Sequence, residues 1–319
     1  MTRKTFLRNG SLALAFLLLP ASQGSAQNRS IKVAYSAISS GIGGLWLTHE
    51  QGLFKKHGLD SSLIYFRSGT IVTQALIAGE IQFGHLSPAP MMTAWAQGAD
   101  FVWIGTTVSQ MVFTLVTEPS ITRGEALKGK RIGITRIGSA SDIAARLALE
   151  HLGLSVKDVT LISMGGIPDI LTGLRAGAVQ AGMLSPPTST VALDLGYRSL
   201  VFIPDLGREF TFSGIAAKRD YVNANPNTAR AFMAALTEGA KIYKEDTKAA
   251  VKVLRRYTGL QKDSITEASY REYAAALASP PYPSLKGLEA VRESLVETTP
   301  LLKQADLKKF IDDRFIKPR

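Results

Sequence analysis

Short loops of Ser, Gly and Thr that precede predicted helices are the residues of this sequence best suited to chemistry. Ser139, Ala140 and Ser141 stand directly before a helical pattern, so their N–H groups and hydroxyls could hold an anion at the positive end of that helix. Ser68 begins a similar helix start. Each loop alone is equally well explained as an ordinary helix N-cap. Four such loops at strand ends favour a shared ligand-binding role.

Three further side chains are candidates, and two of them have two readings. His85 follows a predicted strand and could face a cleft as a donor, or could be a structural histidine. Arg136 could pair with an anion bidentately, or could be a solvated surface arginine. Phe212 could line an apolar wall of a ligand site.

Patterns typical of catalysis or metal binding fail at defined positions. His49 and Glu50 begin like a zinc-protease helix, but Leu53 stands where the second His is needed. A phosphate-loop spacing at residues 124–130 is followed by Arg131 instead of Ser or Thr. The chain has no Cys, which excludes disulfides, thiolate metal sites and cysteine nucleophiles. We therefore expect no enzymatic activity, no cofactor and no metal.

A duplicated segment indicates how these loops are positioned. Residues 76–90 read LIAGEIQFGHLSPAP, and residues 174–188, ninety-eight positions later, read LRAGAVQAGMLSPPT, with eight of fifteen positions identical. Each copy contains a helix end, a Gly, a short apolar strand and a Ser-Pro loop. Two lobes of similar construction are predicted, each with a Ser-Pro loop at the carboxyl end of a strand, where ligands bind in open α/β sheets.

The order of predicted elements favours an α/β fold. Strands and helices alternate, which indicates two doubly wound, mainly parallel sheets. The expected strands cover residues 31–36, 62–66, 82–86 and 101–108 in the first lobe, and 113–117, 131–135, 159–164, 181–184 and 199–203 in the second.

Beyond about residue 220 the pattern becomes helical. Helices are expected from Pro226 and near 247–257, 263–277, 285–297 and 304–314, and they should pack back on the first lobe. The predicted division is residues 1–26 signal peptide, 27–112 first part of lobe 1, 113–220 lobe 2 and 221–319 return to lobe 1. Two crossovers would then act as a hinge.

The N-terminal segment is typical of a cleavable export signal. Arg3, Lys4 and Arg8 precede an apolar run that is too short to span a membrane, and cleavage is expected after Ala26. The first residues also resemble a twin-arginine signal weakly. Removal of the three cations lowers the net charge from +11 to +8. The basic residues form no long block, which disfavours nucleic acid as a partner. We also expect the protein to be soluble, exported and monomeric, without stable membrane insertion.

Three stretches carry a resemblance to a known family. Residues 31–35 (IKVAY), 52–60 (GLFKKHGLD) and 75–84 (ALIAGEIQFG) are similar to the periplasmic substrate-binding proteins of ABC importers for nitrate, sulfonates, taurine and the pyrimidine precursor of thiamine. Residues 127–133 resemble the family's entry to its second lobe. The resemblance covers roughly residues 31–232. It implies the type II periplasmic binding fold, a two-lobed clamshell that closes on a small ligand and delivers it to a permease with its ATPase.

The resemblance also implies a pocket. Matching positions place there Ser39, Ser40, Ser87, Pro88, Ser139, Ser141, Ser185 and Pro186. Where relatives often have an acidic residue, this chain has Ser185, which removes a carboxylate suited to an amino-bearing ligand.

These features together favour an organic sulfonate or a similar small anion as the ligand. A thiamine pyrimidine precursor or a carboxylate is the alternative within the same class. A pyrimidine-synthesising enzyme of the same fold is disfavoured by the lack of Cys. A ligand-loaded sensor that docks on a receptor would use the same clamshell.

Overall fold

A computed structural model describes residues 1–2, 29–208 and 210–316. The expected export signal lies, apart from Met1 and Thr2, outside the described residues. Within the described ranges no helix is both long and apolar enough to cross a bilayer.

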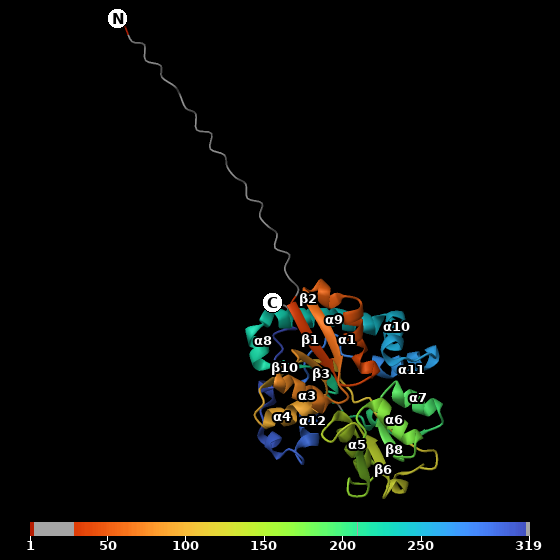
Figure 1. Cartoon of the computed structure of the whole chain (residues 1–319). Coiled ribbons are helices and arrows are strands. Elements are labelled where there is room, and N and C mark those ends of the chain that lie inside the picture. Colours follow the sequence, from red (N-terminus) through yellow and green to blue (C-terminus); the bar gives the residue numbers. More distant parts are fainter. Residues whose placement is uncertain (3–28, 209, 317–319) are drawn as a thin grey trace.

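The described chain forms two lobes, each built on one five-stranded mixed sheet (Figure 1). The first sheet has the order β2-β1-β3-β10-β4 and the second β7-β6-β8-β5-β9. The strands of the first are β1 (Arg29–Tyr35), β2 (Leu59–Tyr65), β3 (Phe83–Leu86), β4 (Phe101–Val108) and β10 (Ser213–Lys218). Those of the second are β5 (Thr114–Thr117), β6 (Arg131–Ile134), β7 (Thr160–Ser163), β8 (Ala181–Leu184) and β9 (Arg198–Phe202). In each sheet four strands run in one direction and one is reversed, which confirms the mainly parallel prediction.

The reversed strand of each sheet is the one that arrives from the other lobe. β5 follows β4 through the first crossover and pairs antiparallel with β8 and β9. β10 follows the second lobe and pairs antiparallel with β3 and β4. The two sheets therefore correspond strand for strand, as the sequence repeat predicts.

The predicted boundary of lobe 2 at residue 220 differs from this arrangement. β10 (Ser213–Lys218) lies inside the first sheet, so the chain has returned to lobe 1 by residue 213. The cause is packing, because Ile215, Ala216 and Ala217 are fully buried between β3 and β4.

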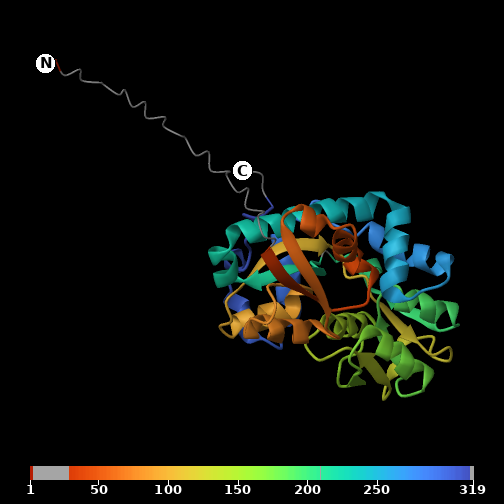
Figure 2. The ribbon, with the colours of Figure 1, turned by 45° about the horizontal axis from the view of Figure 1, so that its top comes forward.

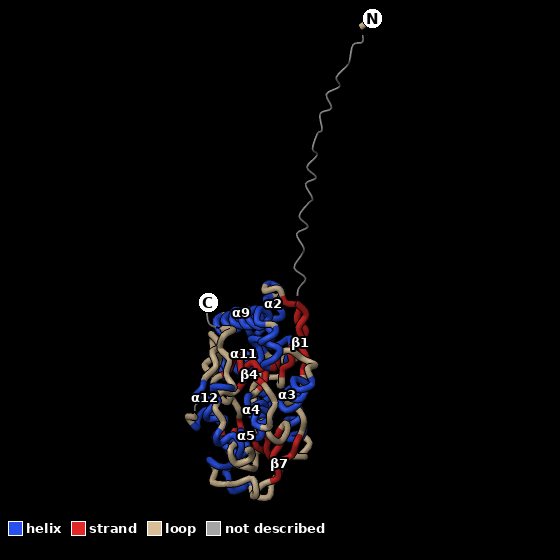
Figure 3. The backbone as a smooth tube through the Cα atoms, turned by 90° about the vertical axis from the view of Figure 1, so that its left-hand side faces the viewer, coloured by secondary structure: helices blue, strands red, loops and turns tan. Residues whose placement is uncertain are grey.

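Helices pack against both sheets, whereas the edge strands β2 and β7 stay partly exposed, and β1 runs along one margin of the molecule in Figure 3. Lobe 1 contributes the 3-10 turn η1 (Ser40–Ile42) and helices α1 (Gly43–Glu50), α2 (Leu53–Lys56), α3 (Gly69–Ala78) and α4 (Pro88–Ala96). Lobe 2 contributes the 3-10 turns η2 (Gly124–Leu127) and η3 (Ile203–Leu206) and helices α5 (Ala140–His151), α6 (Ile167–Arg175) and α7 (Thr188–Asp194).

The C-terminal helices complete lobe 1, as predicted. They are α8 (Arg219–Ala224), α9 (Pro226–Glu245), α10 (Thr247–Thr258), α11 (Asp263–Ala274) and α12 (Leu285–Leu295), followed by the 3-10 turns η4 (Pro300–Gln304) and η5 (Leu307–Lys309). α9 packs on α1 and α2, and α12 packs on α4. α11 lies beside α7 of lobe 2 as well as η1, so this part of the tail bridges the lobes (Figure 2).

The helix predicted at residues 304–314 is wrong. The segment forms only short 3-10 turns, because its backbone bonds to the edge strand β4 instead of to itself. Trp103 N–H donates to the Phe310 carbonyl at 2.7 Å, and Asp312 N–H donates to the Trp103 carbonyl at 3.0 Å. Covering an exposed sheet edge in this way protects it from pairing with other chains.

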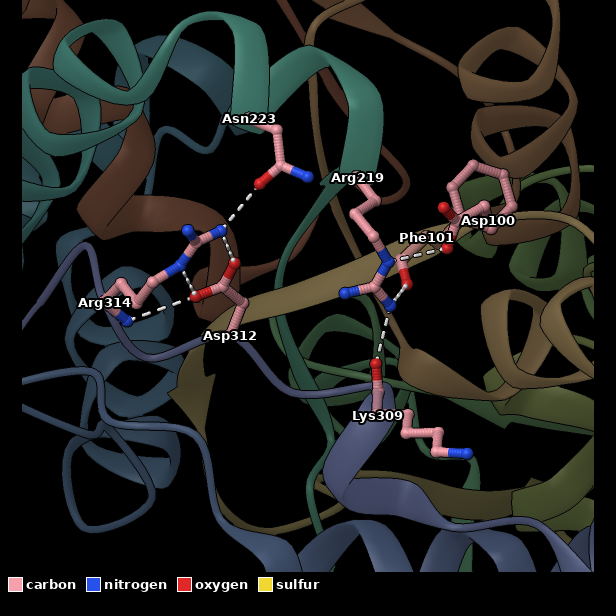
Figure 4. A network of polar contacts seen from close by, with 7 residues as sticks. All are labelled: Asp100, Phe101, Arg219, Asn223, Lys309, Asp312 and Arg314. Carbon is pink, nitrogen blue, oxygen red and sulfur yellow. Dashed lines mark hydrogen bonds and ion pairs between the residues drawn. The ribbon is translucent and has the colours of Figure 1, made fainter.

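Two arginines fasten this segment (Figure 4). Arg219 Nε donates to Asp100 at 2.8 Å, and its Nη2 donates to the carbonyl of Lys309 at 2.6 Å. Arg314 pairs with the buried Asp312 and also donates to Asn223 at 2.8 Å. The end of the described chain is thereby tied to α8 and β4.

Candidate functional site

A cavity of about 50 Å³ lies between the two lobes. It is formed by loops that follow strands of both sheets, together with the two crossovers. Its lining residues are Ser36, Ala37, Ser39, Gly41, Ile42, Ser68, Gly69, Ser87, Phe113, Thr135, Ser139, Ala140, Ser141, Ile167, Ser185, Phe212 and Ser213. Eight serines and one threonine are in this set, and no charged residue of the described chain belongs to it.

The lobe 1 wall presents the first turns of two helices. Ser68 caps α3 by accepting from Thr70 N–H at 3.3 Å, and Ser87 caps α4 by accepting from Ala89 N–H at 3.4 Å. Neither helix has an acidic residue in its first turn. Both helix starts therefore keep their partial positive charge next to the cavity.

The lobe 2 wall is different, because its hydroxyls satisfy one another. The Oγ atoms of Ser139 and Ser141 and the Oγ1 of Thr135 lie 2.9 Å apart in each pair. Thr135 N–H also donates to Ser141 Oγ at 2.9 Å. Asp142, in the first turn of α5, is buried and accepts from Gly138 N–H at 2.8 Å. This carboxylate partly compensates the positive end of α5.

Apolar side chains complete the cavity. The Phe113 and Phe212 rings, one from each crossover region, pack edge to face with centroids 5.4 Å apart. Ile42 and Ile167 also contribute apolar surface. A cavity with neutral hydrogen-bonding groups and an apolar part suits a small ligand that has a polar head and an apolar body.

The structure places eight of the thirteen predicted site residues on this cavity. They are Ser39, Ser68, Ser87, Ser139, Ala140, Ser141, Ser185 and Phe212. The other five, Ser40, His85, Pro88, Arg136 and Pro186, do not line it.

Each of these five has a different position. Arg136 is exposed, because its neighbour Thr135 points into the site. Pro88 is buried at the first turn of α4. Ser40 N–H donates to the Pro186 carbonyl at 3.0 Å, so these two residues join the lobes.

His85 lies behind the cavity as a buried structural histidine. Its Nε2 is 2.8 Å from Thr107 Oγ1, and its Nδ1 has no partner. Burial lowers the pKa of His85 to about 3, because desolvation penalises the imidazolium. The ring is therefore neutral at physiological pH.

This burial predicts acid sensitivity of the fold. Because the folded-state pKa of His85 is depressed, its stability contribution is complete above pH 6.5 and is lost as the pH falls toward 3. Between pH 7 and pH 5 the loss from this residue is about 2 kcal/mol. Urea unfolding of wild type and His85→Gln at both pH values measures it. Equal acid dependence in the two proteins would contradict the assignment.

The lobes touch around the cavity. Arg67 Nη2, after β2, donates to Asp169 of α6 at 3.1 Å, and Ser185 Oγ donates to Ser39 Oγ at 3.5 Å. Together with the Ser40–Pro186 bond, these contacts describe a closed conformation.

Sequence reasoning did not identify nine of the lining residues, namely Ser36, Ala37, Gly41, Ile42, Gly69, Phe113, Thr135, Ile167 and Ser213. Most are neighbours of predicted residues in the same loops, so extension by one or two positions would have found them. Phe113 in the first crossover and Ile167 at the start of α6 have no predicted site residue near them in the sequence.

Among the described residues, no group of three or more His, Cys, Asp or Glu side chains is arranged to hold a metal ion.

Comparison with known proteins gives a consistent result. The family model described as "NMT1/THI5 like" matches residues 39–250. A Brucella abortus (strain 2308) protein that is provisionally named a binding protein is 29% identical over 273 residues, covering 84% of this chain and 83% of that protein. The taurine-binding periplasmic protein of Escherichia coli K12 is 24% identical over 181 residues, 56% of each chain.

Among solved structures, the alkanesulfonate-binding protein SsuA of Xanthomonas axonopodis pv. citri, bound to MOPS, superposes with a TM-score of 0.77. The two chains are 22% identical, and the match covers 89% of this chain and 98% of that one. At this identity the comparison establishes the fold.

Proposed function

This chain belongs to the NMT1/THI5-like family, and we propose that it is the exported solute-binding component of an ABC importer that captures a small organic anion, with an organic sulfonate favoured. The resemblance drawn from the sequence is confirmed for family and fold. The ligand, the export by an N-terminal signal, the periplasmic location and delivery to a permease with its ATPase are parts of the proposal.

The observation that carries the proposal is the cavity between the lobes. It combines hydroxyl groups and two uncompensated helix starts with apolar walls, and it contains no charged side chain of the described chain. Such a site suits a weakly hydrated monoanion with an apolar body, because N–H dipoles and hydroxyls can stabilise one negative charge without a counter-ion.

The alternatives are less well supported. An aminopyrimidine would lack a carboxylate partner, since Ser185 stands where an acidic residue would serve it. A carboxylate ligand would accept hydrogen bonds from the same donors as a sulfonate, so only a binding measurement distinguishes the two. An enzyme would need an activated nucleophile, but the chain has no Cys, and the serines of the cavity have no His, Lys or carboxylate among the lining residues to activate them. A sensor role would use the same ligand site.

Binding would operate by lobe closure. A ligand that contacts Ser68 and Ser87 of lobe 1 and Ser139 of lobe 2 is bound by both walls only when the lobes meet. It stabilises the closed state by the difference between its interactions in the closed and open states.

The test is calorimetric titration of residues 27–319 with alkane and aryl sulfonates, taurine, nitrate, carboxylates and hydroxymethylpyrimidine. We expect a sulfonate to bind, and Ser87→Ala to raise its Kd by about tenfold or more, because a hydrogen bond to a charged group contributes about 1.5–3 kcal/mol.

Ser284→Ala is the matched control. Ser284 also caps a helix, accepting from Gly287 N–H at 3.0 Å, but it does not line the cavity. Its loss should lower stability by about 1 kcal/mol without changing Kd. Binding of hydroxymethylpyrimidine alone would reject the anion, and binding of nothing in the panel would reject the ligand class.

A further inference from the structure

A chain of hydroxyl groups connects the cavity to the C-terminal tail. Ser185 Oγ of lobe 2 donates to Ser39 Oγ at 3.5 Å, and Ser39 Oγ donates to the Tyr273 hydroxyl of α11 at 2.9 Å. The Tyr273 hydroxyl donates to the Val112 carbonyl at 3.5 Å. All four residues are buried, and Val112 lies in the first crossover. This series of hydrogen bonds therefore joins both lobes, the C-terminal helices and the first crossover.

The Val112 carbonyl, which is the last acceptor in this series, determines which hydroxyl donates in each hydrogen bond. A carbonyl can only accept, so Tyr273 must donate to Val112. Tyr273 has one proton, so it must accept from Ser39, and Ser39 must in turn accept from Ser185. Burial raises the pKa of Tyr273, which keeps its hydroxyl protonated. In this closed conformation Ser39 thus points its proton away from the cavity that it lines.

We propose that Tyr273 is a positioning residue for the ligand site. Tyr273 holds Ser39 in place and allows the Ser39 hydroxyl to donate its proton either to Tyr273 or to the ligand. When an anion accepts the Ser39 proton, Tyr273 turns its own proton from Val112 to Ser39. Ser39 then keeps a partner in both states, and the only hydrogen bond given up is the long 3.5 Å contact to the Val112 carbonyl. This inference rests on the proposed ligand site and adds a residue outside it.

Two neighbouring features support this role for Tyr273. A Cβ atom on Gly41 would lie 2.8 Å from Tyr273 Cε1, so the absence of a side chain at Gly41 is what lets the ring reach Ser39. The same helix also contacts lobe 2, where Ser269 Oγ donates to Thr190 Oγ1 at 3.1 Å and Thr190 donates to Glu272 at 3.0 Å. α11 thus lies against both lobes when they are closed (Figure 1).

The experiment is a double-mutant cycle on Kd with Tyr273→Phe, Ser39→Ala and the double variant, using the tightest-binding member of the ligand panel. Each single variant should raise Kd about tenfold, and the double variant should be no weaker than either, because Tyr273 acts through Ser39. Tyr270→Phe is the matched control, since this hydroxyl on the same helix donates to the Lys244 carbonyl at 2.8 Å and contacts no cavity residue. Additive effects, or equal Kd values for the two Tyr→Phe variants, would overturn the proposal.

A second measurement needs no ligand. Because the chain has no Cys, spin labels at Ile77→Cys of lobe 1 and Val156→Cys of lobe 2, both exposed, report the distance between lobes. Tyr273→Phe and Ser39→Ala should reduce the closed population to the same degree, and Tyr270→Phe should not. If no panel member binds, the proposed ligand class fails, and this distance distribution alone decides the role of Tyr273. A distribution unchanged by Tyr273→Phe would then overturn it.

Discussion

Replacing Ala140 by leucine should abolish ligand binding while the protein stays folded. Ala140 is the first residue of α5 and lines a cavity of only about 50 Å³. Protein interiors are close-packed, so three added carbon atoms at this position occupy space that a ligand needs. Because Ala140 is not fully buried, the leucine can be accommodated without displacing the core. We expect Kd to rise more than a hundredfold in calorimetric titration.

The control for this experiment is Ala178→Leu, the same change at an exposed position of lobe 2. It should leave both Kd and the unfolding midpoint unchanged. Retained affinity in Ala140→Leu would mean that the ligand occupies another site, and a collapse of stability would mean that the start of α5 belongs to the core.

The fold was largely predictable because the duplication is visible in the sequence. Residues 76–90 form the end of α3, β3 and the start of α4, and residues 174–188 form the corresponding end of α6, β8 and the start of α7. The periodic patterns of these segments are local, and local patterns predict elements well.

Two errors in the fold have one physical cause. β10 was not assigned to the first sheet, and residues 304–314 were expected to be helical. In both cases the backbone bonds to strands that are distant in sequence, namely β3 and β4 for β10 and β4 for the last segment. Such long-range pairing overrides the local preference of the chain.

The sequence predicted the part of the site that consists of serines at helix starts. Ser68, Ser87 and Ser139 are N-cap positions, which the sequence pattern indicates directly. The direction of a side chain at a strand end is harder to predict. Arg136 points to solvent while the adjacent Thr135 lines the cavity. Tyr273 is 234 residues from its partner Ser39, and nothing near it in the sequence relates it to the site.

Truncation of Phe232 to alanine should destabilise lobe 1 by about 3–5 kcal/mol, because it removes a fully buried ring and leaves a cavity. Phe232, in α9, stacks on Phe83 of β3 with centroids 4.0 Å apart and on Phe54 of α2 at 5.2 Å. The ring therefore links the C-terminal helices to the sheet that carries half of the ligand site. Leu301→Ala, at an exposed position of the same tail, should change stability by no more than about 0.5 kcal/mol. Urea unfolding of both variants measures the difference. A small effect of Phe232→Ala would mean that lobe 1 folds without the C-terminal helices. The expected loss of stability would show that these helices are part of the core of lobe 1. It would also explain how Tyr273 is held firmly against Ser39.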